Sequence, residues 1–78
     1  MKELTFKAAL FTLIRHNNGK YFAYETAISP NYHEADGDSE FSCYPVLFTN
    51  EGIGTPHCGF KITLKKKEFE IKSLIEQD

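Results

Sequence analysis

Residues 3–28 of the chain read ELTFKAALFTLIRHNNGKYFAYETAI, and they carry its clearest structural signal. In residues 3–16 the even positions are nearly all apolar and the first odd positions are polar, which is the period of a β-strand rather than that of a helix. The second half of this run is apolar at successive positions, so we expect both of its faces to be covered. Residues 21–28 are rich in strand-forming side chains and predict a second strand.

The tripeptide Asn17-Asn18-Gly19 joins these two strands. An Asn-Gly pair between apolar runs predicts a tight hairpin, because both residues tolerate positive φ angles. We expect a three-residue loop with Gly19 in the left-handed conformation. The resulting pairs are Ile14 with Phe22, Thr12 with Tyr24, and Ala8 with Ile28.

Further strands are expected in the second half of the chain. Residues 41–49 are mostly apolar, and Pro45 among them predicts an edge strand or a bulge, because proline cannot donate to a ladder. Residues 60–64 and 68–72 alternate between apolar and polar side chains, which predicts a second hairpin. Its expected pairs are Leu64 with Phe69, Ile62 with Ile71, Lys65 with Glu68, and Thr63 with Glu70.

Two segments between the strands are expected to be irregular. Residues 30–40 are polar and acidic, and residues 50–59 contain several glycines and a proline, which interrupt regular structure. Long loops of this kind are often functional. Beyond Lys72, the apolar pair Leu74 and Ile75 leaves open a short C-terminal helix in place of a strand.

These patterns predict an all-β domain, or a β-rich α+β domain if the C-terminal helix forms. We expect a small five-stranded antiparallel sheet that is strongly bent or curled into an open barrel, because such curling hides the edges of the sheet. The chain has 78 residues, which is too short for two ordinary domains, so residues 1–78 are expected to form one domain.

The sequence also bears on the compartment. It has no run of about 20 apolar residues, so we expect no membrane-spanning helix. Glu3, Lys7 and Arg15 interrupt the apolar N-terminal run, and no export signal is recognised there. Cys43 and Cys58 are too few for a secreted disulfide scaffold. We therefore expect a cytoplasmic protein with reduced thiols, and whether the two cysteines pair is left open.

The polar residues form no recognisable catalytic or metal-binding motif. His57 and Cys58 are adjacent and would point to opposite faces of a strand, so they do not predict a zinc site. Residues 36–40 lack the ligand spacing of a calcium loop, and residues 54–61 lack the lysine placement of a phosphate-binding loop. So short a chain also leaves little room for a substrate pocket of about 300 Å³. We therefore expect a non-enzymatic protein with no catalytic residue, metal or cofactor.

The charges are unevenly distributed along a chain whose net charge is −2. Residues 21–60 contain no lysine or arginine, whereas residues 61–72 are rich in lysine. We expect the two loops to form one acidic, aromatic face that docks on a basic protein partner, in the manner of an inhibitor or adaptor, since tyrosine is favoured at interfaces. The expected partner-binding residues are Tyr32, His33, Glu34, Asp36, Asp38, Glu40, Glu51, Ile53 and His57.

An alternative function involves the lysine-rich hairpin. Small barrels bind single-stranded nucleic acid through aromatic side chains and a basic groove. Lys65, Lys66 and Lys67 lie on one turn and could contact phosphates. The overall acidity of the chain makes this alternative weaker than a protein partner. The identity of the partner and the oligomeric state stay open at this level.

Overall fold

The computed structural model describes residues 4–6 and 8–72, and in this part of the chain nearly all regular structure is strand. The strands are β1 (Thr5–Phe6), β2 (Phe11–His16), β3 (Tyr21–Glu25), β4 (Glu40–Phe48), β5 (Ile53–Pro56), β6 (Ile62–Lys65) and β7 (Phe69–Ile71). Two short 3-10 helices complete the described elements, η1 (Tyr32–Glu34) and η2 (Lys66–Glu68). The all-β class is confirmed, with seven strands where five were expected. The expected C-terminal helix lies outside the described residues.

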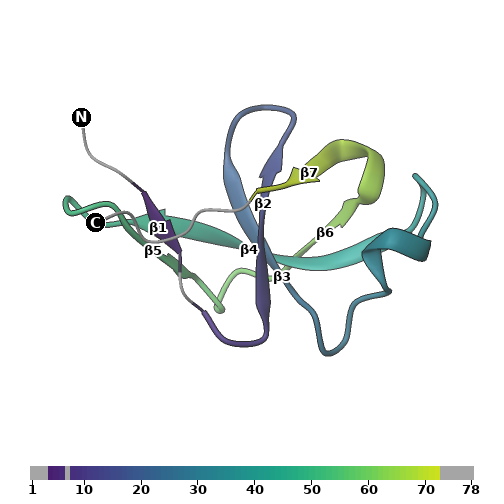
Figure 1. Cartoon of the computed structure of the whole chain (residues 1–78), viewed down its shortest axis with the longest axis horizontal. Coiled ribbons are helices and arrows are strands. Elements are labelled where there is room, and N and C mark those ends of the chain that lie inside the picture. Colours follow the sequence, from purple (N-terminus) through teal and green to yellow (C-terminus); the bar gives the residue numbers. More distant parts are fainter. Residues whose placement is uncertain (1–3, 7, 73–78) are drawn as a thin grey trace.

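The strands form one strongly curled, open sheet (Figure 1). Its order is β1-β5-β4-β3-β2-β7, and β6 also pairs with β4. The β1–β5 pair is parallel, and the other pairs are antiparallel. The expectation of a bent sheet or open barrel is therefore confirmed, whereas the expectation of a wholly antiparallel sheet is wrong.

The hairpin of β2 and β3 has the expected register near its turn. Ile14 pairs with Phe22 and Thr12 with Tyr24, and Gly19 has a φ of 94°. The expected pair of Ala8 with Ile28 does not form, because the ladder ends at Phe11 and Glu25.

A break at Leu10 explains both the short ladder and the separation of β1 from β2. Leu10 has a φ of 69°, a left-handed conformation in which a strand cannot continue. Its carbonyl accepts hydrogen bonds from the Thr26 amide at 2.9 Å and from the Thr26 hydroxyl at 3.0 Å. The expectation of one strand over residues 3–16 is therefore wrong. β1 instead pairs with β5, at the far side of the sheet from β2.

The expected hairpin between β6 and β7 is absent. η2 separates the two strands, β6 pairs with β4, and β7 pairs with β2. The reason lies in the turn, because a two-residue hairpin favours residues that accept positive φ, and lysines do not. The wider turn directs each strand to a different neighbour and leaves the barrel open between them.

Strand β4 runs through the middle of the sheet and is not an edge strand. It pairs with β3, and it also pairs with β6 in its first half and with β5 in its second half. Pro45 lies where the partner changes from β6 to β5, and residues 57–61 loop out there. A missing N–H is tolerated at such a break, so Pro45 marks a change of partner strand and not an edge strand.

Strand β5 lies within residues 50–59, which were expected to be irregular. The error comes from reading every glycine as a turn residue. Gly54 lies inside β5, and a Cβ atom at this position would lie 2.7 Å from Cε1 of Phe48. Gly54 is therefore required for close packing between β4 and β5 rather than for a turn.

Two clusters of buried side chains stabilise the curled sheet. The larger one consists of Ile14, Tyr24, Phe41, Cys43, Leu64 and Phe69. The smaller one consists of Leu13, Ala23 and Val46, with Phe6, Phe11, Tyr21 and Phe48 packed against it. Because neighbouring residues of a strand point to opposite faces, Leu13 and Ile14 place β2 between the two clusters. The expectation that this strand is covered on both faces is thus confirmed.

Candidate functional site

The acidic loop, residues 30–40, packs against η2, and the side chain of Lys66 makes several of the contacts. The Lys66 ammonium donates hydrogen bonds to the carbonyls of Tyr32 at 2.7 Å and Ala35 at 2.8 Å. The same nitrogen lies 4.4 Å from the centre of the Tyr32 ring, within range of a cation–π interaction. These contacts hold the loop against η2, and its backbone is irregular as expected, apart from η1.

A second lysine of η2 pairs with an acid of the loop. Lys67 lies 2.9 Å from Asp38, and both side chains are largely exposed. The hydrogen bond from Lys67, followed by the charges of Lys67 and Lys65, lowers the pKa of Asp38 below its ordinary value. Conversely, the hydrogen bond to Asp38 and its charge raise the pKa of Lys67.

The lysine-rich turn and the acidic loop lie side by side in the structure. The lysine-rich turn and the acidic loop are distant in sequence but neutralise each other in part. Lys66 and Lys67 have partners in the loop, so they do not form the open basic groove that binding of single-stranded nucleic acid requires. That alternative therefore gains no support from the arrangement of the lysines.

A hollow of about 340 Å³ lies between β3 and the acidic loop, lined by Tyr24, Thr26 and residues 29–33. Its volume reaches the lower end of the range of ligand-binding sites, but it is a hollow open to solvent and not an enclosed cavity. Ser29 contributes a buried hydroxyl that has no hydrogen-bond partner among the described residues. A buried polar atom without a partner is uncommon in folded proteins.

The walls of the hollow rest on the larger core cluster. The Tyr24 ring centre lies 5.1 Å from that of Phe41, and the Tyr32 ring centre lies 6.1 Å from it. Tyr32 also packs against Phe69, with ring centres 6.0 Å apart. Both tyrosines are thus held by the core, and Tyr32 is also held by Lys66.

The acidic loop, whose first residues line the hollow, also carries exposed carboxylates. Glu34, Asp36 and Glu40 are exposed and form no ion pair within residues 4–6 and 8–72. Asp36 accepts hydrogen bonds from the amide of Asp38 at 2.9 Å and the hydroxyl of Ser39 at 3.3 Å, which fixes the turn of the loop. These carboxylates form an acidic rim, defined here as Glu34, Asp36 and Glu40.

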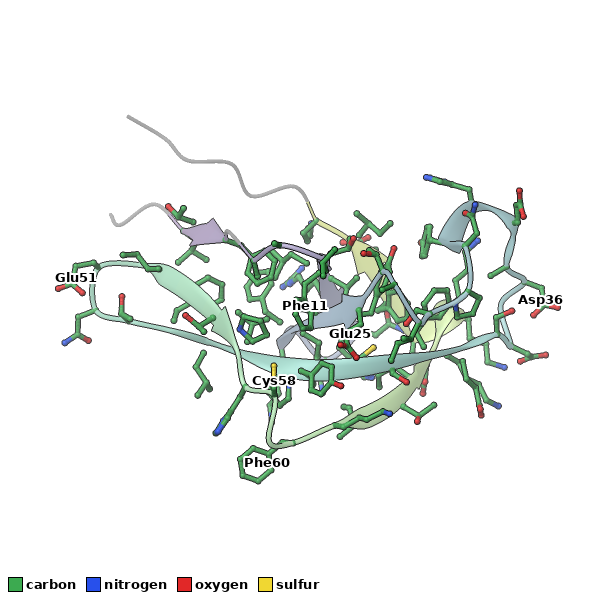
Figure 2. The ribbon with its side chains drawn as sticks, turned by 90° about the horizontal axis from the view of Figure 1, so that it is seen from below. Phe11, Glu25, Asp36, Glu51, Cys58 and Phe60 are labelled. Carbon is green, nitrogen blue, oxygen red and sulfur yellow. The ribbon has the colours of Figure 1, made fainter. Side chains whose placement is uncertain are left out.

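The structure brings together one group of the expected partner-binding residues and separates the others from it. Tyr32, His33, Glu34, Asp36, Asp38 and Glu40 all lie in the acidic loop or where it enters β4. Figure 2 shows Asp36 and Glu51 at opposite ends of the molecule. Ile53 begins β5, and His57 follows it with its ring centre 4.5 Å from that of Phe60. The two loops therefore do not form one continuous face.

Several residues of the hollow were missed by the sequence analysis. Tyr24 was assigned to a strand, and Ser29, Pro30 and Asn31 only to the end of that strand and the start of a loop. No pattern in the sequence indicates that these residues surround a cavity. A local signal was present at Asn31, whose side chain accepts a hydrogen bond from the His33 amide at 3.0 Å and so caps η1.

The two thiols have different environments. Cys43 is fully buried in the larger core cluster, whereas Cys58 is exposed, and both are free. Burial raises the pKa of Cys43 to about 12, so almost none of this thiol is ionised near neutral pH.

We therefore expect Ellman's reagent to modify only Cys58 in the native protein at pH 8. Cys43 should react at a comparable rate once denaturant exposes it. The measurement is the number of thiols modified per chain before and after denaturation, with Cys58→Ser as the control. Rapid native modification of Cys43 in that variant would show that the larger core cluster opens readily.

Other features of the described chain are limited. Within residues 4–6 and 8–72, no group of three or more His, Cys, Asp or Glu side chains is placed to hold a metal ion. The same part of the chain has no helix with the length and apolar character of a membrane span. No protein-family model, curated protein or solved structure matches the sequence or the fold. The function is therefore inferred from the site itself.

Proposed function

We propose that the protein is a non-enzymatic binding module that docks on a basic protein partner. The docking end consists of the hollow and the acidic rim beside it. The observation that supports this most strongly is the clamp by Lys66, because it holds the segment between Tyr32 and Ala35, which lines part of the hollow and carries the exposed Glu34. We also propose that this takes place in the cytoplasm, where the two cysteines would stay reduced.

The two parts of the docking end have different roles in this proposal. The acidic rim attracts a basic surface over a distance and orients it, which raises the rate of association more than the final affinity. The hollow accepts a side chain or a short segment of the partner, and burial of that segment supplies most of the affinity. Because Lys66 already orders the loop, the entropy lost on binding is reduced.

The acidic rim can be tested with a pair of charge variants. Glu34→Gln together with Glu40→Gln removes two rim charges, and Asp36 is kept because it fixes the turn. We expect this variant to capture its specific partner from a cell lysate about fivefold less well, since the loss of steering slows association. Capture is measured by quantitative mass spectrometry, and thermal melting confirms that the variant is folded.

The control pair for this experiment is Glu51→Gln with Glu70→Gln. It removes the same charge from positions outside the acidic loop, and Glu70 loses only a surface contact with Lys72. We expect this pair to capture the partner as well as the native chain does. Equal losses in both pairs would show that only net charge matters, and equal retention would remove the acidic rim from the binding surface.

A further inference from the structure

Strand β6 lies at an edge of the curled sheet. It pairs with β4 on one side, and no strand in the described part of the chain pairs with its other side. The turn through η2 leads from β6 to β7 without joining the two strands, so the edge of β6 borders the opening of the barrel. A strand edge of this kind presents backbone donors and acceptors to which another extended chain can bind.

The register shows which backbone groups point to this edge. The Lys66 amide donates to the Ser39 carbonyl at 2.9 Å, which continues the ladder of β4 and β6 by one pair. Because hydrogen-bonded and non-hydrogen-bonded pairs alternate in an antiparallel ladder, the residues two and four positions before Lys66 also bond to β4. Thr63, between them, therefore directs its amide and its carbonyl to the open edge, and it is an exposed residue. The Lys65 amide also points away from β4, because it donates to the Glu68 carboxylate at 2.7 Å.

The side chains along this edge differ between the two faces of the sheet. Ile62 is 36% exposed and pairs with Cys43, so it lies on the face covered by the larger core cluster. By alternation, Lys61, Thr63 and Lys65 point to the opposite face, and all three are exposed. The Lys61 side chain forms no hydrogen bond or ion pair with residues 4–6 and 8–72, so its charge is available to a partner.

The two lysines determine which kind of chain can pair here. In the longest antiparallel pairing with a second copy of this chain, Lys61 would lie opposite Lys65 of that copy. Like charges directly opposite each other destabilise a strand pair, whereas opposite charges stabilise it. The lysines thus disfavour self-association through this edge, and they favour a segment with carboxylates at the two facing positions. Lys61 contributes more than Lys65, because Lys65 already has Glu40 opposite it on β4.

We propose that the edge of β6 binds an extended acidic segment of another protein as an additional antiparallel strand. Acidic residues of the segment lie beside Lys61 and Lys65, and its backbone exchanges hydrogen bonds with Thr63. The apolar residues between the acids lie beside Ile62 and Leu64, on the face of the larger core cluster. This inference goes beyond the proposed function, because it concerns a different surface and a partner of opposite charge.

Synthetic peptides test the inference by titration of the whole chain, followed by backbone amide NMR. The acidic probe is Ac-SEVTVES-amide, and the basic probe is Ac-SKVTVKS-amide, which has the same apolar and β-branched side chains. We expect the acidic probe to bind about tenfold or more tightly than the basic probe, because two facing charge pairs change sign. Amide shifts should move in residues 61–65 and stay constant near Glu51.

N-methylated forms of the acidic probe distinguish strand pairing from a purely electrostatic contact. A methyl group on the central threonine nitrogen removes the hydrogen bond to the Thr63 carbonyl. A methyl group on the nitrogen of the following valine points away from β6, so this probe is the matched control. We expect the first methylation to weaken binding about fivefold or more, and the second to leave the affinity nearly unchanged.

A variant of the chain tests the charge of the edge. Lys61→Gln should weaken binding of the acidic probe about threefold, because one favourable charge pair is lost. The matched control is Lys20→Gln, because Lys20 is an exposed lysine between β2 and β3, away from the edge of β6. Lys20→Gln should bind the acidic probe as the native chain does, and equal losses in both variants would show that only net charge matters, which would contradict the proposed site.

The remaining results also decide the inference. Equal binding of the acidic and basic probes would overturn the preference for an acidic segment, and equal binding of the two methylated probes would overturn the added strand. Failure of every probe to bind at millimolar concentration would overturn the inference as a whole. None of these results bears on the proposed function, because the capture experiment with the acidic rim decides it separately.

Discussion

Phe41→Ala is expected to leave the chain largely unfolded at room temperature. Phe41 is completely buried in β4, and its ring centre lies 5.4 Å from that of Phe69 and 5.1 Å from that of Tyr24. Truncation of a buried phenylalanine costs about 3–5 kcal/mol, because it removes apolar burial and leaves a cavity. The net stability of a protein of this size is roughly 3–5 kcal/mol. The cost of Phe41→Ala is therefore about as large as the entire free energy of unfolding.

The measurement is urea unfolding followed by circular dichroism. Phe41→Leu keeps most of the volume and should leave a folded protein with a lower midpoint, which allows the loss to be quantified. Phe60→Ala is the matched control, because Phe60 is 59% exposed and its ring packs on His57 outside the two buried clusters (Figure 2). A cooperative transition of Phe41→Ala at the native midpoint would contradict the described core.

Lys66→Met is expected to lower the free energy of unfolding by about 2 kcal/mol, which corresponds to a fall in melting temperature of roughly 10 °C. The variant keeps the aliphatic part of the side chain but removes the ammonium. Two charged hydrogen bonds and a cation–π contact are lost, and the half-buried carbonyls of Tyr32 and Ala35 lose a strong donor. The expected loss in free energy of unfolding is smaller than the summed energies of the three contacts, because water replaces part of each one.

The effect of Lys66→Met should also be local. Hydrogen exchange of the amides in residues 30–39 should accelerate more than exchange in β2 and β3, because the acidic loop loses its clamp. Lys61→Met is the control, since Lys61 is exposed and its side chain has no hydrogen bond or ion pair to residues 4–6 and 8–72. Equal exchange rates in the loop of native protein and Lys66→Met would show that other contacts order the loop.

The parts of the fold that the sequence predicts well are governed by local chemistry. The hairpin at Gly19 was predicted because a turn that requires positive φ and two apolar strands act within a few residues. The burial of β2 on both faces followed from its composition alone. The hairpin depends on neighbours in sequence, whereas the burial of β2 needs only apolar side chains on both of its faces, whichever strands cover them.

The predictions about the fold that were wrong have a different physical origin. The left-handed Leu10 is held by Thr26 on the other strand of the hairpin, and no residue pattern around Leu10 indicates it. Gly54 packs closely on Phe48 of the neighbouring strand, and a glycine within a turn-rich segment does not reveal such a contact. The second hairpin failed because its strands pair with β4 and β2, and periodicity specifies which face is buried but not which strand is adjacent.

The candidate site was predicted in part for the same reason. The composition of the acidic loop identified Tyr32, His33 and the carboxylates that follow. It did not identify the hollow, which needs Tyr24 from another strand, nor the lysine clamp, which comes from η2. It also joined Glu51 to the same face, although β4 separates the two loops by its full length.

Site-specific photo-crosslinking in cells tests the docking end most directly. A photoreactive p-benzoylphenylalanine is placed either at His33, which is exposed beside the hollow, or at Glu51, which is exposed at the opposite end. Irradiation should join the chain to a basic protein from position 33 and should give no such product from position 51. A product from position 51 alone, or from neither position, would contradict the proposal that this end of the molecule meets the partner.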